Sequence, residues 1–156
     1  HVPIVMVAVP LLDVDMDDAV LYSLRQATAA ALGTREGARL SCVTVIASGV
    51  ASPTRDNDSE TTLHRRHLSQ LRHWAKPLAS PELQTSCHVL ESADVAQALV
   101  NYAVGNHVSV IVMGAATHGL MTQRFVATVP IKVAMAAPCT VILVKKVLPF
   151  ERLADA

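Results

Sequence analysis

The sequence has no excess of charge of either sign. Its 156 residues include 13 lysines and arginines against 13 aspartates and glutamates, so the formal net charge at pH 7 is zero. A chain without a global electrostatic field is not attracted as a whole to polyanions. We therefore expect small partners, and we expect neither nucleic acid nor a membrane surface as a ligand.

Cysteine is scarce and long apolar runs are missing. The three cysteines, Cys42, Cys87 and Cys139, are far apart in the sequence and form no CxxC pair. This spacing argues against a disulfide framework or a zinc knuckle, and we interpret the three as reduced core residues. No apolar run approaches the about 20 residues of a membrane span, and no basic-then-apolar signal segment opens the chain. These absences predict a cytoplasmic protein.

Hydrophobic residues, in contrast, make up 51% of the chain. At this length the composition fits one well-packed domain, because two domains would each have too small a core. We expect that domain to span residues 1–146. The chain begins with His1 rather than Met, which is compatible with a piece cut from a longer polypeptide.

Apolar runs alternate along the chain with segments of helical period. This alternation predicts βαβ units, and hence a parallel sheet with helices on both faces. The first run is apolar at every position after Pro3, as in a strand that is covered on both faces. The expected strands are 3–9, 38–47, 84–92, 108–114 and 139–146, and the expected helices are 15–32, 59–78, 93–106 and 128–138.

The segment VMGAATHGLMTQRFVATVP, Val112 to Pro130, leaves an apolar strand, passes two glycines and reaches a helix start. In open α/β sheets ligands bind outside the carboxyl ends of the strands, where the strand order reverses. This segment is therefore the first place to look for a ligand site.

The longer stretch from Val108 to Lys146 resembles the carboxyl-terminal half of a universal stress protein domain. The most telling residues are IVMG at 111–114 and APCTVILV at 137–144, and the order of elements matches over nearly the whole chain. The resemblance implies a three-layer α/β sandwich with a five-stranded parallel sheet of order 3-2-1-4-5. Such a fold is Rossmann-like, of the adenine-nucleotide alpha-hydrolase type, and the resemblance implies a role in the stress response.

Members of this family that bind ATP share a GxxGx(9)G(S/T) loop, whose register can be laid on this chain. Its first glycine falls on Gly114 and its hydroxyl position on Thr128, but the other two glycine positions hold Thr117 and Ala127. Glycine permits positive φ and lets backbone N–H groups approach phosphate without a Cβ in the way. With two of the three glycines missing, we interpret the loop as degenerate.

Two further departures weaken the expected nucleotide site. Pro130, at the second expected helical position, offers no N–H to an anion at the helix N-terminus. Pro10 stands where ATP-binding relatives place an aspartate after the first strand, and Asp13 could replace it only if the intervening leucines fold back. No cofactor is firmly implied, and ATP is the candidate.

Alternatives stay open at this site. Gly114, Thr128 and Arg124 could together hold a phosphate, with adenine bound by the backbone of the strand ends. In a purely structural interpretation, Gly114 instead satisfies a left-handed or tight-turn conformation, and Thr128 caps a helix.

Other polar clusters favour structural roles. The carboxylates of DVDMDD, Asp13 to Asp18, are interpreted as capping the first helix rather than as a calcium or phosphatase site. His64 and His67 share a helix face, but no third metal ligand is evident. We expect a solvated basic face there, with four residues packing inward: Leu63, Leu71, Trp74 and Leu78. No catalytic residue is assigned.

The apolar last strand predicts a homodimer. An edge strand exposes unpaired N–H and C=O groups, which a second copy can pair, and the family resemblance implies the same. We expect the contact to run through Thr140, Val141, Ile142, Leu143 and Val144, and the tail, 147–156, to cover the partner.

Together these features predict a dimeric, non-catalytic binding or signalling module with a degenerate ATP loop. One alternative is an ATP-binding family member that hydrolyses ATP slowly. Another is the regulatory domain of a larger serine/threonine kinase, since such fusions occur in the family. The chain itself lacks the glycine-rich strand with its lysine, the HRD motif and the DFG motif of a kinase catalytic domain.

Overall fold

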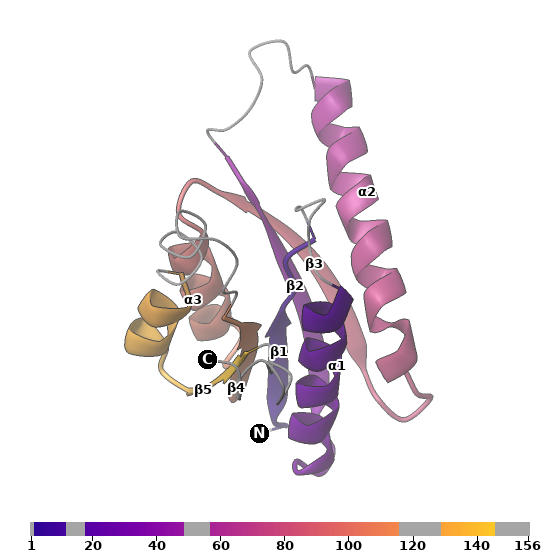
Figure 1. The fold of residues 1–156 in the computed structure, drawn as a ribbon, viewed down its shortest axis with the longest axis vertical. Coiled ribbons are helices and arrows are strands. Elements are labelled where there is room, and N and C mark those ends of the chain that lie inside the picture. Colours follow the sequence, from indigo (N-terminus) through magenta and orange to yellow (C-terminus); the bar gives the residue numbers. More distant parts are fainter. Residues whose placement is uncertain (1, 12–17, 49–56, 116–128, 146–156) are drawn as a thin grey trace, which may run out of the picture.

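A computed structural model describes residues 2–11, 18–48, 57–115 and 129–145. It has three layers, with one sheet between two layers of helices (Figure 1). The elements are β1 (Ile4–Ala8), α1 (Asp18–Gly33), β2 (Arg39–Ala47), α2 (Asn57–Ala75), the 3-10 turn η1 (Lys76–Leu78), β3 (Thr85–Ser92), α3 (Val95–Gly105), β4 (Val110–Gly114) and β5 (Thr140–Val144). A further helical segment, 129–136, precedes β5.

The sheet has the strand order β3-β2-β1-β4-β5, and all four pairings are parallel. The predicted fold class and strand order are therefore confirmed. The chain builds from β1 outward to β3 and then crosses back to β4. Because β1 lies between β2 and β4, the carboxyl ends of β1 and β4 are neighbours where the order reverses, and Ala8 is in register with Met113.

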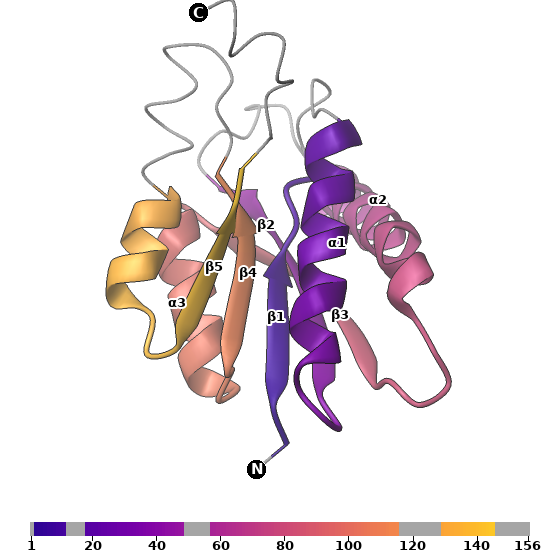
Figure 2. The same cartoon turned by 60° about the horizontal axis from the view of Figure 1, so that its bottom comes forward.

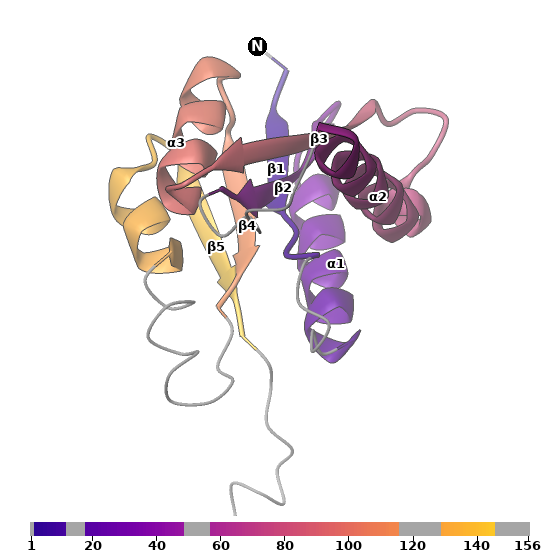
Figure 3. The same cartoon turned by 90° about the horizontal axis from the view of Figure 1, so that it is seen from above.

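Each face of the sheet is covered by different helices. Figures 2 and 3 show α1 and α2 on one face, and α3 with the 129–136 helix on the other. Register partners on neighbouring strands point to the same face of the sheet. One row of such partners crosses all five strands on the α1/α2 face, and most of its residues are fully buried. These residues are Cys87, Cys42, Val7, Val112 and Ile142.

The long helix differs from its predicted bounds. It was expected over 59–78, whereas α2 runs from Asn57 to Ala75 and the turn η1 follows. Pro77 lies in η1, where its missing N–H and its ring stop an α-helix from continuing. Leu71 and Trp74 pack inward as predicted, and Leu63 and Leu78 are half-buried.

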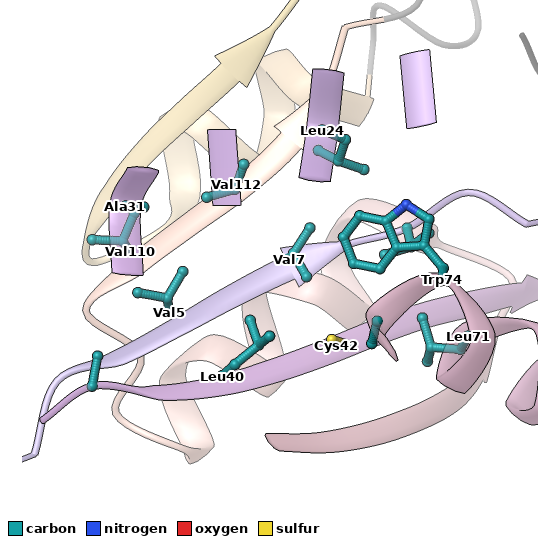
Figure 4. Close-up of a cluster of buried hydrophobic side chains, with 13 residues drawn as sticks. Val5, Val7, Leu24, Ala31, Leu40, Cys42, Leu71, Trp74, Val110 and Val112 are labelled. Carbon is teal, nitrogen blue, oxygen red and sulfur yellow. The ribbon is translucent and has the colours of Figure 1, made fainter. Parts of the chain in front are cut away.

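Helices α1 and α2 are joined through Trp74, which is buried between them (Figure 4). Its indole N–H donates to the carbonyl of Leu21 over 3.2 Å. In return, Nε of Arg25 donates to the Trp74 carbonyl over 3.0 Å, and the guanidinium carbon lies 5.4 Å from the ring centroid. This cation–π contact and the two hydrogen bonds fix the two helices relative to each other.

Within the described part of the chain, no helix combines the length and the apolar character that crossing a membrane would require.

Leu71 gives a direct test of the α2 packing. Leu71→Ala should lower the free energy of unfolding by about 2–5 kcal/mol, because the side chain is fully buried and its removal leaves a cavity. Urea unfolding, followed by the fluorescence of the single tryptophan, measures the change. The matched control is Gln70→Ala at the neighbouring exposed position. Equal stability of the two variants would contradict this packing.

Candidate functional site

The strand β1 leaves the sheet at the edge where a ligand is expected. Val9 is still held there, because its N–H donates to the carbonyl of Val43 over 2.8 Å. The next residue, Pro10, is exposed. At the position where the family resemblance expects an aspartate, the chain thus presents a ring with neither a carboxylate nor an N–H group.

Gly114 is the last residue of β4 and lies at the same edge. It is in register with Val144, and the following Ala115 donates its N–H to the Val144 carbonyl over 2.8 Å. Its φ is not in the left-handed region, which among the described glycines is adopted by Gly37 alone. The interpretation that Gly114 satisfies a left-handed conformation is therefore wrong. A tight turn would involve the residues after Ala115, which lie outside the described residues.

Packing does not demand a glycine at this position either. A Cβ on Gly114 would lie 3.7 Å from Cγ1 of Val20 and 4.0 Å from the carbonyl oxygen of Val144, which are ordinary contacts. The contact with Val20 also places the first turns of α1 over the end of β4. The described contacts thus do not require a glycine at this position.

The helical segment 129–136 carries Pro130 as its second described residue. Pro130 is buried, and Val129 packs against the apolar cluster beneath α3. Proline in a first turn leaves the helix intact but removes one backbone donor. Pro130 is thus a buried residue of the first helical turn.

The remaining predicted site residues lie outside the described residues. These are Asp13, Thr117, Arg124, Ala127 and Thr128. Of the acidic run at 13–18, only Asp18 is described, as the first residue of α1. The structure thus places Gly114 and Pro10 at the predicted edge, and the assignment of the other residues stays a prediction.

His67 differs from its prediction. It was expected on a solvated basic face, but it is 2% exposed. Its Nδ1 lies 2.7 Å from the carbonyl oxygen of Leu63, so Nδ1 carries the proton and donates it. Among the described residues, its buried Nε2 has no hydrogen-bond partner. The spacing of four and then three residues from His67 through Leu71 to Trp74 is that of one helix face, and it was the signal that could have shown this burial.

Metal binding gains no geometric support in the described part of the chain. His64 is exposed, so it does not share the buried environment of His67. No three side chains of the metal-binding types gather there.

Two of the three cysteines are neighbours, which the sequence analysis missed. Cys42 on β2 and Cys87 on β3 are register partners, although they are distant in sequence. The Cys42 thiol donates a hydrogen bond to Cys87, and the positive charge of Arg72 is nearby. Together these lower the pKa of Cys87 to about 7 against the opposing effect of burial. The same hydrogen bond, and then burial, raise the pKa of Cys42.

A parallel sheet of order 3-2-1-4-5 with helices on both faces defines a Rossmann-like fold. The sequence pattern of the Universal stress protein family matches residues 11–145. The chain therefore belongs to that family. No curated protein matches the sequence significantly.

Solved structures of family members share this fold. The universal stress protein from Archaeoglobus fulgidus in complex with dAMP has a TM-score of 0.62 at 20% identity, over 93% of this chain and 98% of that one. A family protein from Arabidopsis thaliana with AMP bound has a TM-score of 0.62 at 17% identity, over 93% and 92%. UspA from Lactobacillus plantarum has a TM-score of 0.57 at 21% identity, over 92% and 99%. At such identities the likeness establishes the fold alone.

The unpaired nitrogen of His67 leads to a stability prediction. His67→Leu should raise the free energy of unfolding by about 1–2 kcal/mol, because a buried polar atom without a partner costs about 1–3 kcal/mol. Chemical denaturation followed by circular dichroism measures it. His64→Leu, at an exposed position of the same helix, should change stability by less than about 0.5 kcal/mol. A destabilised His67→Leu variant would show that Nε2 has a partner in solution.

Proposed function

We propose that this protein is a dimeric, non-catalytic binding module of the universal stress type, with a degenerate site for adenine nucleotides. The observation that carries the proposal is the pair of strand ends where the sheet order reverses. There β4 ends in Gly114, where a Cβ would meet only ordinary contacts, and the exposed Pro10 follows the end of β1 by two residues. The glycine of a nucleotide site is thus present as Gly114, and the aspartate of such a site is replaced by Pro10.

The relatives support adenine nucleotide as the ligand class. The proteins from Archaeoglobus fulgidus and Arabidopsis thaliana were solved with dAMP and with AMP. Contacts from strand-end backbone to a base depend little on side chains, whereas phosphate binding depends on free N–H donors. A chain with Thr117, Ala127 and Pro130 in its phosphate loop should therefore bind the base and hold the phosphates poorly.

At the described ends of β1 and β4, only backbone groups and apolar side chains are available to a ligand. Residues 9–11, which follow β1, and residues 114–115 of the β4 end carry no ionisable or nucleophilic side chain. Covalent or acid–base catalysis needs such groups within hydrogen-bond reach of the substrate.

Restoring the missing glycines tests the degenerate loop. Thr117→Gly with Ala127→Gly should tighten ATP binding by at least about tenfold, because one regained hydrogen bond to a charged phosphate contributes about 1.5–3 kcal/mol. Titration calorimetry with ATP and with AMP measures it. In the unchanged protein the two affinities should agree within about threefold, since phosphates contribute little.

The controls distinguish an effect on the phosphate loop from an effect on folding. Ala134→Gly adds a glycine at an exposed position of the 129–136 helix and should leave affinity unchanged. Pro130→Ala is added in a second step with its own melting curve, because Pro130 is buried. If the glycines bring no gain in a folded protein, the defect lies elsewhere and Pro10→Asp is the next variant. Micromolar ATP binding by the unchanged protein would overturn the proposal in favour of an ATP-binding member.

The edge strand β5 supports the dimer. It pairs with β4 on one side, and its other edge has no strand beside it in the described chain. Three large apolar side chains are exposed on β5 and on the helix 129–136 that precedes it: Leu143 at 41%, Ile131 at 56% and Met135 at 84%. Ile131 and Met135 are four residues apart and so share a helix face. A second copy pairing along Thr140 to Val144 would cover them.

A charge introduced on β5 tests the predicted dimer. Leu143→Glu should convert a dimer into a monomer, because it places a carboxylate in an apolar contact between two copies. Sedimentation equilibrium measures the mass. The matched control is Val104→Glu on α3, which alters a residue of similar exposure, 53%, away from β5. A monomeric unchanged protein, or a variant that stays dimeric, would refute this interface.

A further inference from the structure

The two neighbouring cysteines have a geometry that suits a crosslink. Their Cα atoms are partners in the parallel β2–β3 ladder, so both side chains leave the sheet on the same face. Adjacent strands are about 4.8 Å apart, which lies inside the Cα separation of about 4.4–6.8 Å that disulfides span. Both residues belong to the apolar cluster beneath α1 and α2, in which Figure 4 shows Cys42 close to Leu71.

The two thiols differ in their access to solvent. Cys42 is fully buried in the second strand, whereas Cys87 lies on β3 at the edge of the sheet and is half-buried. A small oxidant can therefore reach Cys87 first, because Cys42 is shielded from solvent. This is the arrangement of an attacking and a resolving thiol.

The surroundings also favour Cys87 as the reactive member. The thiol of Cys42 donates to it, and Arg72 on α2 supplies positive charge. With its pKa at about 7, Cys87 is about half thiolate at neutral pH, whereas an ordinary thiol with a pKa of 9.0 is about 1% thiolate. The thiolate is the nucleophilic form.

We propose that Cys42 and Cys87 form an oxidation site, at which a hydroperoxide converts the two thiols into a reversible disulfide between β2 and β3. The site is distinct from the strand ends discussed above, and it does not depend on nucleotide binding.

The reaction proceeds in two balanced steps. The Cys87 thiolate attacks the distal oxygen of the hydroperoxide, the O–O bond breaks, and the sulfur becomes a sulfenic acid. The departing alkoxide or hydroxide takes a proton from solvent. The sulfur of Cys42 then attacks that of Cys87, the S–O bond breaks, and the Cys42 proton leaves with the hydroxide as water. Sulfur loses two electrons and the peroxide gains them.

The position of the pair also makes the bond reversible. In the described sheet β3 is the edge strand next to β2, and Cys87 is half-buried. A disulfide that is partly exposed is accessible to a reducing thiol, which attacks it by thiol–disulfide exchange.

The test treats the reduced full chain with one equivalent of hydrogen peroxide at pH 7. Remaining thiols are then blocked with N-ethylmaleimide in denaturant, and peptides are mapped by mass spectrometry without reduction. The expected product is an intramolecular Cys42–Cys87 link that dithiothreitol reverses. Free thiols at both positions, or oxidation spread equally to Cys139, would overturn the proposal.

Variants assign the two roles. Cys42→Ala should stop the reaction at a Cys87 sulfenic acid, which dimedone traps. Cys87→Ser should yield neither the link nor the adduct, while Cys139→Ser should behave as the unchanged protein. Circular dichroism shows which variants fold. If Cys42→Ala does not fold, dimedone capture at Cys87 in the unchanged protein, before the disulfide forms, decides the order of the steps.

A rate measurement keeps the proposal testable without core substitutions. At pH 7, Cys87 has about fiftyfold more thiolate than an ordinary thiol, but each thiolate is about eightfold less nucleophilic because its pKa is lower. Cys87 should therefore react with iodoacetamide about sixfold faster than an ordinary thiol. Cys139 is an internal standard of similar exposure, whose pKa burial raises. Arg72→Gln should slow Cys87 alone, and the exposed Arg66→Gln should not. Equal rates for Cys87 and Cys139 would refute the role of Cys87.

Discussion

The strand β1 is paired along both edges and covered on both faces, and the rest of the fold is arranged around it. It bonds to β2 and β4, and Val5, Met6 and Val7 are fully buried. A strand in this position has no room for a polar side chain. Residues that could bind a ligand can therefore follow the strand only where the chain leaves the sheet. The pairing of β1 with β4 in the core therefore brings their carboxyl ends together, and these ends form the edge at which we propose that a ligand binds.

In the function that we propose, the two parts of nucleotide recognition depend on different groups at this edge. Backbone groups at the ends of strands are fixed by the sheet and persist when side chains change. Phosphate binding needs donors and small residues in the loops, and there this chain has proline and residues with a Cβ. Pro130, which has no N–H to offer at the helix start, is itself buried. On our proposal, the scaffold keeps its shape although its phosphate-binding part is weakened.

The order of elements, the sheet order and the position of Gly114 could be predicted from the sequence, since apolar periodicity and family resemblance bear on them directly. The burial of His67 was visible in principle through its spacing from Leu71 and Trp74, but charged neighbours on the same helix outweighed that signal. The pairing of Cys42 with Cys87 could not be predicted from spacing alone. Their contact follows from the register of two strands, and register depends on the packing of both faces.

The pairing of β1 with β4 also has a consequence for how the chain folds. The backbone N–H of Ile4 bonds to the hydroxyl of Ser109, which is 105 residues later. Contacts between such distant segments make loop closure costly and folding slow. During synthesis β1 can pair with β2 long before β4 has emerged, so one edge of the most apolar strand stays open. The newly made amino-terminal half therefore passes through a stage in which that edge can pair with another chain, and the arrival of β4 ends this stage.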